Sequence, residues 1–267
     1  MSGSSDAPPS TDRNRAAAAP GSVDDREVAR FEALAAEWWD PGGRFRPLHR
    51  LNPERIRFIR DRLAARFGRD PEGGRPLDGL SLLDIGSGGG LVAEPMARLG
   101  AAVTGIDPSP RNVAVAEAHA RDMGLAVTYR AATAEQLAEE GARFNVVLAL
   151  EVVEHVADLG AFLDAATALV APGGALIAST LNRTAKAFLL AIVGAEYVLG
   201  WLPRGTHDWH RFLTPAELSA ALEARGLAVA EVAGLSYSPL ARRWRLSGDT
   251  GVNYFVLAAR DVGNEGR

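Results

Sequence analysis

The stretch Leu82-Leu83-Asp84-Ile85-Gly86-Ser87-Gly88-Gly89-Gly90 places a glycine-rich turn directly after a short apolar run, and helical spacing follows from Leu91 to Leu99. Glycine has no Cβ, so such a turn lets a ligand approach the backbone, and the N-terminus of the following helix adds amide donors. Asp107 stands 21 residues after Gly86, at the end of the next predicted strand. A carboxylate there can accept the protons of both hydroxyls of a ribose. The strand, the glycines and the aspartate together predict a nucleoside site.

The segments around this turn alternate between predicted strands and helices. Strands are expected at residues 81–85, 102–106, 126–130, 145–150 and 175–180, with helices at 91–99, 112–123, 134–140 and 159–170 between them. This alternation predicts an α/β fold, with a mostly parallel sheet between two layers of helices and right-handed crossovers. A further helix is expected at 214–225, and strands at 227–233 and 254–259. Because no helix is expected between these two strands, we expect an antiparallel hairpin at the sheet edge.

The chain divides into a core domain and its extensions. Residues 1–22 are rich in Ser, Pro, Ala and Gly, and we expect a disordered leader. Residues 23–78 are predicted to form an N-terminal helical cap, with one helix over 25–40 and a second that begins at Asn52. Asn52 would cap the second helix, and Pro53 suits its first turn. The core is assigned to residues 79–260, with an insertion at 182–213 and a tail at 261–267.

The composition of the 267 residues excludes several classes of protein. With 47% hydrophobic and 23% charged residues, the chain can bury a core, which excludes fibrous and wholly disordered classes. A formal charge of −4 gives no general attraction for a polyanion, so we expect no nucleic-acid partner. The absence of cysteine excludes disulfides, thiolate metal sites and cysteine nucleophiles. The leader holds no apolar run long enough for a signal peptide, so a cytoplasmic location is expected.

Two further residues narrow the choice of nucleoside. A dinucleotide-binding turn has a third glycine in the pattern G-x-G-x-x-G, where this chain has Leu91, and this disfavours a nicotinamide cofactor. Asp84 would lie inside a strand, where burial of an unpaired carboxylate is costly, and a cationic ligand would supply a partner. Asp84, Gly86, Gly88 and Asp107 match the pattern of the class I S-adenosylmethionine-dependent methyltransferases, which the chain resembles. The resemblance implies S-adenosylmethionine as cofactor and a Rossmann-like, seven-stranded sheet whose last two strands are antiparallel.

A narrower resemblance is to the ubiquinone-biosynthesis O-methyltransferases, which methylate polyprenylated catechols and demethyl-quinols. It spans nearly the whole ordered chain and depends on the joint order of several stretches: Phe31-Glu32-Ala33, Glu37-Trp38-Trp39-Asp40, Pro47-Leu48-His49-Arg50-Leu51-Asn52-Pro53, Glu151-Val152-Val153-Glu154-His155-Val156, Ser179-Thr180-Leu181-Asn182-Arg183, Val193-Gly194-Ala195-Glu196-Tyr197 and Gly205-Thr206-His207-Asp208. The resemblance implies methyl transfer to a phenolic hydroxyl of such a substrate, and it leaves open an association with other enzymes of quinone biosynthesis. It also implies that Arg55, Gly86, Asp107 and Leu150 contact the cofactor.

Glu151, Glu154 and His155 follow the fourth predicted strand, at the end of the sheet where ligands bind. In a helical turn their side chains would project to one side. Because a phenol must lose its proton before or during attack, we assign catalysis to this group, with three interpretations open. The three could bind Mg²⁺, Mn²⁺ or Zn²⁺, and the family resemblance links this group to divalent cations. Alternatively, His155 is a general base, or the acidic residues only favour a helix N-terminus beside a histidine.

The stretch from Ala187 to Leu202 is the most apolar part of the chain but is too short to span a membrane. Flanked by basic residues, it is suited to the surface of the inner face of a membrane, where a polyprenyl substrate resides. An ordinary buried helix is the alternative. The arginine-rich stretch at 44–66 offers a second membrane contact or a solvated helix face. Within it, Arg55 could bind the cofactor carboxylate through two hydrogen bonds.

Two smaller groups are left with open roles. His207, Asp208 and His210 could line the acceptor pocket, close a lid or form a solvated loop. One of the pair Trp38-Trp39 is expected in the core, and the other could cover the cofactor.

The sequence therefore predicts a peripherally membrane-associated O-methyltransferase of ubiquinone biosynthesis that uses S-adenosylmethionine. Three other functions stay open at this point. They are a methyltransferase that acts on a soluble small molecule, a nicotinamide oxidoreductase, and a lipid-bound scaffold that binds the cofactor without turnover.

Overall fold

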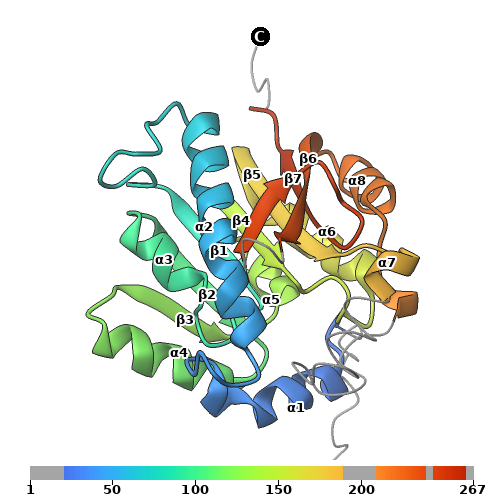
Figure 1. Ribbon diagram of the computed structural model, residues 1–267. Coiled ribbons are helices and arrows are strands. Elements are labelled where there is room, and N and C mark those ends of the chain that lie inside the picture. Colours follow the sequence, from blue (N-terminus) through green and yellow to red (C-terminus); the bar gives the residue numbers. More distant parts are fainter. Residues whose placement is uncertain (1–20, 189–208, 239–242, 263–267) are drawn as a thin grey trace, which may run out of the picture.

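The computed structural model describes residues 21–188, 209–238 and 243–262, whose core is one mixed sheet of eight strands (Figure 1). The sheet order is β3-β2-β1-β4-β5-β8-β6-β7. The strands are β1 (Ser81–Ile85), β2 (Ala102–Asp107), β3 (Val127–Ala131), β4 (Phe144–Leu150), β5 (Val170–Leu181), β6 (Ala228–Ser238), β7 (Arg243–Ser247) and β8 (Asn253–Ala259). Strands β1 to β5 are parallel, whereas β8 is antiparallel to β5 and β6, and β7 is antiparallel to β6.

Helices cover both faces of this sheet (Figure 1). They are α1 (Asp25–Ala33), η1 (Ala35–Glu37), α2 (Arg46–Arg66), α3 (Ala93–Arg98), α4 (Pro110–Asp122), α5 (Ala134–Glu139), α6 (Leu159–Ala168), α7 (Ala185–Ala187), η3 (Trp209–Arg211) and α8 (Pro215–Glu223). Successive strand residues point to opposite faces. Leu82 therefore packs with the apolar residues of α2, α3 and α4, whereas Leu83 packs with those of α5, α6 and α8. The predicted three-layer α/β fold is confirmed.

The last strands differ from the expected hairpin. The strands β6 and β8 pair antiparallel, as predicted, but the chain first forms β7 at the outer edge of the sheet. Along β7, Arg243 and Arg245 are exposed, while Trp244 and Leu246 pack against the core on the side of α2. The described sheet thus has eight strands where seven were expected. Charged residues are common on an exposed edge strand, and here they mask its apolar period.

The N-terminal helices also begin and end differently from the prediction. The helix expected over 25–40 ends at Ala33 and continues as η1. The helix expected from Asn52 begins at Arg46 instead, with Pro47 in its first turn and Pro53 inside it. Asn52 therefore lies inside α2 and does not cap it. Its side-chain amide donates to the carbonyl of Leu91 at 2.7 Å. This bond ties α2 to the segment that follows the glycine turn.

Some expectations fall on residues that the structure does not describe. These are residues 1–20 of the leader, most of the apolar stretch from Ala187 to Leu202, His207 and Asp208, and residues 263–267 of the tail. Within the described ranges, no helix combines the length and the apolar character that crossing a bilayer requires.

Candidate active site

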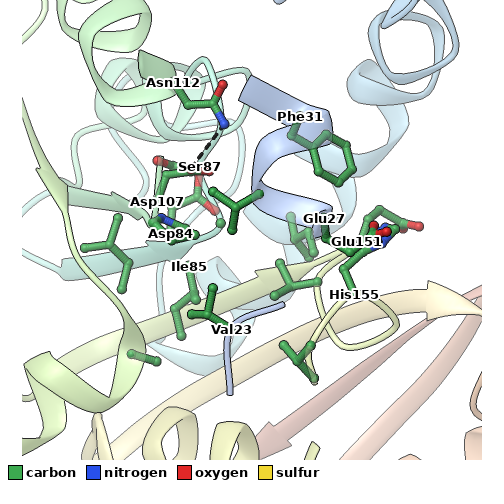
Figure 2. A pocket seen from close by; sticks show the side chains of 18 of the residues that line it. Val23, Glu27, Phe31, Asp84, Ile85, Ser87, Asp107, Asn112, Glu151 and His155 are labelled. Atoms are coloured by element: carbon green, nitrogen blue, oxygen red, sulfur yellow. Dashed lines mark hydrogen bonds and ion pairs between the residues drawn. The ribbon is translucent and has the colours of Figure 1, made fainter. Parts of the chain in front are cut away.

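A cavity of about 260 Å³ lies at the carboxyl ends of β1, β2 and β4 (Figure 2). The segment from Ser22 to Phe31, which includes most of α1, covers it and contributes Val23, Glu27 and Phe31 to its lining. In open α/β sheets this end of the strands is where ligands bind. The cavity lining brings together eight of the nine sequence-predicted site residues: Arg55, Asp84, Gly86, Asp107, Leu150, Glu151, Glu154 and His155. Gly88 is not part of the lining, although its amide donates to Asp107.

The glycines of the turn make room chiefly for the protein's own side chains. Gly86 and Gly88 have φ values of 70° and 52°, which favour glycine. A Cβ on Gly88 would lie 2.4 Å from the ring of Trp38, and one on Gly86 would lie 2.7 Å from Val152. A Cβ on Gly90 would lie 2.3 Å from the hydroxyl of Tyr129. The turn is therefore tightly packed by the protein's own side chains, and any side chain at these three positions would clash.

Asp107 ends β2 and anchors a hydrogen-bond network. Its carboxylate accepts from the amides of Gly88 at 3.1 Å and Ser109 at 2.9 Å. It also accepts from the side chain of Asn112 at 3.1 Å (Figure 2). Burial raises the pKa of Asp107, and these three hydrogen bonds partly oppose that rise. A carboxylate has about four acceptor sites, so three bonds leave capacity for a ligand hydroxyl.

Asp84 and Arg55 are two buried ionisable residues that line the same cavity. Burial raises the pKa of Asp84 to about 7, although the nearby Arg55 guanidinium lowers it in part. Arg55 is 4% exposed, and burial lowers its pKa against the opposing charges of Glu151, Asp84 and Glu154. Within the described chain, Nε and Nη2 of Arg55 and Oδ2 of Asp84 are buried without a hydrogen-bond partner. Buried groups of this kind are costly unless a ligand pairs with them.

These residues fit S-adenosylmethionine. The guanidinium of Arg55, two of whose nitrogens lack a hydrogen-bond partner, suits a carboxylate. The buried Asp84 suits a cationic group, and Asp107 suits ribose hydroxyls. One ligand that carries all three groups is an amino acid joined to a nucleoside. The walls are mostly apolar, and they include Ile106, Leu150 and Ala132.

The three residues after β4 do not form the expected ligand set. Residues 151–158 form turns and bends rather than a helical turn, and Glu151 has a φ of 56°. The Glu151 carboxylate accepts from Ser179 at 2.8 Å and from Asn253 at 3.0 Å. Glu154 is 4% exposed, and burial raises its pKa to about 7. The carboxylate of Glu151 is therefore held by two side-chain hydrogen bonds, whereas Glu154 is buried.

A divalent ion does not fit this arrangement. Among the described residues, no group of three or more His, Asp or Glu side chains is arranged so that it could hold a metal ion. Nδ1 of His155 lies 2.7 Å from Oε2 of Glu27, so the histidine pairs with a different carboxylate. The helical turn expected at these residues is absent, although all three side chains line the cavity.

The contact between Glu27 and His155 was not predicted. Glu27 lies on α1, 128 residues away in the chain, and it is 21% exposed. Burial alone would raise the pKa of Glu27, but the hydrogen bond and charge of His155 lower it below its usual value. Because a carboxylate only accepts, Nδ1 of His155 would carry the hydrogen. Phe31 also meets the His155 ring edge to face, with 5.2 Å between centroids.

The covering segment is attached by further polar contacts. The amide of Ser22 donates to Glu135 at 3.2 Å, and its carbonyl accepts from the amide of Ala157 at 2.7 Å. Asp24 pairs with Arg211 of η3 at 2.9 Å. His210, the one described member of its predicted cluster, lies in η3 and outside the cavity lining. The contacts of α1 could not be found from local pattern, because each joins it to a distant part of the chain.

The sequence and the fold are both similar to those of known methyltransferases. Residues 49–232 match the family model of a methyltransferase domain. The chain is 59% identical to the ubiquinone biosynthesis O-methyltransferase of Methylobacterium nodulans, over 90% of this chain and 97% of the relative. It is 57% identical to the enzyme of that name from Azorhizobium caulinodans, over 90% and 94%. The fold is similar to magnesium protoporphyrin IX methyltransferase from Synechocystis with bound SAH, with a TM-score of 0.61, 20% identity, and 88% and 96% of the chains covered.

Proposed function

Since the chain belongs to the family of ubiquinone biosynthesis O-methyltransferases, we propose that it methylates a phenolic hydroxyl of a polyprenylated catechol or demethylubiquinol with S-adenosylmethionine. The observation that carries this proposal is the continuity of the cavity. Its lining runs from Asp107 and Asp84, which suit the cofactor, to the pair of Glu27 and His155, which suits a phenol.

The cofactor end is built from three charged residues. Asp107 would accept from the ribose, Arg55 would bind the carboxylate, and Asp84 would face the cationic part of the cofactor. The cofactor supplies a methyl group on a sulfonium, whose bond to sulfur breaks as the phenol oxygen attacks in line. Leu150 and Gly86 also line this end of the cavity and would contact the bound cofactor.

At the acceptor end, His155 would remove the phenol proton. With Nδ1 bonded to Glu27, Nε2 is the nitrogen that would receive it. The hydrogen bond to Glu27 would fix which ring nitrogen of His155 carries the hydrogen and would hold the ring in place. Glu151, held by Ser179 and Asn253, lies 3.9 Å from Arg55 and links the two ends of the cavity.

The test combines transfer with binding. Purified protein is incubated with methyl-labelled S-adenosylmethionine and a short-chain prenyl catechol. His155→Gln should lower the rate of transfer by about 100-fold or more, while the affinity for S-adenosylhomocysteine stays unchanged. Glu27→Gln should lower the rate by a smaller factor, and Glu117→Gln, an exposed glutamate on α4, is the matched control. Binding without transfer to any phenol would contradict the proposal.

Chelation separates two ways to activate the phenol. Transfer that survives EDTA supports the pair of Glu27 and His155 as the activating group. Transfer that is lost with EDTA and restored by Mg²⁺, Mn²⁺ or Zn²⁺ assigns that role to a metal and removes it from His155.

We also propose that the protein works at the inner face of a membrane, because its substrate is lipophilic. The support is the apolar composition of Ala187 to Leu202 and its basic flanks. Co-sedimentation with anionic liposomes that weakens in high salt is the expected result. Equal recovery with and without liposomes would favour a methyltransferase for a soluble acceptor.

A further inference from the structure

Two tryptophans of the N-terminal segment, Trp38 and Trp39, contact the glycine turn. Trp38 stacks on Phe45, with 3.8 Å between centroids, and donates from its indole nitrogen to Asn112 at 3.0 Å. Trp39 donates from its indole nitrogen to the carbonyl of Gly89 at 2.9 Å. Trp38 is buried and belongs to the core, whereas Trp39 is only partly buried. The hydrogen bond from Trp39 therefore joins this side chain directly to the backbone of the turn.

A polar chain fixes the orientation of Trp39. Its ring lies flat on His119 of α4, with 3.4 Å between centroids and 6° between planes. Nδ1 of His119 lies 2.6 Å from Oε1 of Glu94, in the first turn of α3. Glu94 is fully buried, and its other oxygen lies 3.4 Å from Arg98. A buried carboxylate is costly, and an apolar side chain would fill the same space at lower cost.

The carbonyl that Trp39 holds belongs to one peptide of the turn. The amide of Gly90, at the other end of that peptide, donates to the carbonyl of Ser87 at 2.9 Å. The peptide between Gly89 and Gly90 is therefore fixed at both its oxygen and its nitrogen. Rotation of this peptide would change the shape of the turn on which the cofactor lies.

We propose that Glu94 and His119 are positioning residues that act through Trp39 to hold the Gly89 carbonyl, and so preset the glycine turn for the cofactor. The inference deepens the proposed function, because it takes the turn as part of the cofactor site. It concerns affinity for the cofactor rather than the chemical step.

Trp39→Phe is the sharpest test, because phenylalanine keeps an aromatic face for His119 but has no N–H for Gly89. We expect its Kd for S-adenosylhomocysteine, measured by calorimetry, to rise about five- to tenfold. The rate of transfer at saturating cofactor should stay close to that of the original protein. Trp244→Phe on β7 is the matched control and should leave both quantities unchanged.

Glu94→Gln tests the remote end of the chain of contacts. It should weaken binding about threefold or more when Trp39 is present, and add nothing when Trp39 is already phenylalanine. A purely structural role would lower the melting temperature with the Kd unchanged. If Glu94→Gln does not fold, His119→Phe replaces it in the same double-mutant cycle.

Two results would overturn the inference. One is a Kd for Trp39→Phe within about twofold of the original protein, and the other is fully additive effects in the cycle. If the original protein does not bind S-adenosylhomocysteine at all, the proposed function is wrong. This outcome differs from a failure of the inference about Glu94 and His119, in which the original protein still binds.

Discussion

Asp84 should make the stability of the ligand-free protein depend on pH. Its side chain is 3% exposed, and burial raises its pKa from 3.8 to about 7. In the unfolded chain the group ionises near its ordinary value, so between these two pKa values the folded state binds the extra proton. The free energy of unfolding therefore falls as pH rises through this window.

The size of the effect follows from the two pKa values. Between about pH 5.5 and about pH 8.5, ionisation of Asp84 should cost the folded state about 2 kcal/mol, of a total near 4 kcal/mol. Asp84→Asn removes the titration. The variant should therefore gain about 2 kcal/mol relative to the original protein over this range. Glu154, whose pKa is also raised to about 7, is present in both proteins and cancels in the difference.

The assay is urea unfolding of both proteins at the two pH values, with the exposed Asp122→Asn as the control. Saturating S-adenosylmethionine should shrink the difference, because a cationic ligand near Asp84 favours its ionised form. A difference that stays constant with pH, within about 0.5 kcal/mol, would refute the argument that burial governs this carboxyl.

Three further substitutions probe the packing and the site. Gly88→Ala should cost about 2 to 4 kcal/mol in urea unfolding, because it adds a Cβ 2.4 Å from Trp38 at a φ of 52°, and a cost below about 0.5 kcal/mol would contradict this. Asp107→Asn replaces one acceptor oxygen with an amide group, which is a donor and would face the donors of Gly88, Ser109 and Asn112. Calorimetry should therefore show S-adenosylhomocysteine binding at least about tenfold weaker. Tyr254→Phe removes the hydroxyl that donates to Leu213 at 3.0 Å, and thermal unfolding should show a loss of about 1 kcal/mol, with no loss if that bond is unimportant.

The cofactor half of the site could be predicted because it is local in sequence. Asp84, Gly86 and Asp107 belong to one unit of strand, turn, helix and strand, whose parallel pairing brings them to one edge. The continuous apolar runs of β1 and β4 were equally readable, since both strands are buried on both faces. The strand β7 was missed because its arginines and Trp244 give no clear apolar run.

The acceptor half could not be predicted in the same way. The sequence suggested a helical turn at Glu151, but a positive φ at a residue other than glycine leaves no mark in the sequence. Glu27 is one of two acidic residues in the first turn of α1, a common arrangement that does not mark a site. Its role depends on α1 returning across the sheet to His155, a contact between residues 128 positions apart.

The attachment of α1 has a consequence for synthesis. The covering segment is translated before the rest of the described chain, and Asp24 must wait for Arg211, 187 residues later. At about 5 to 20 residues per second, this delay is roughly 10 to 40 s. Until His119 and His155 have been translated, the nascent chain presents Trp39 and Phe31 without the rings that they contact in the folded protein. Such exposed apolar surface is a target for chaperones. The ion pair of Asp24 with Arg211, which attaches the covering segment to η3, forms only after these contacts become available.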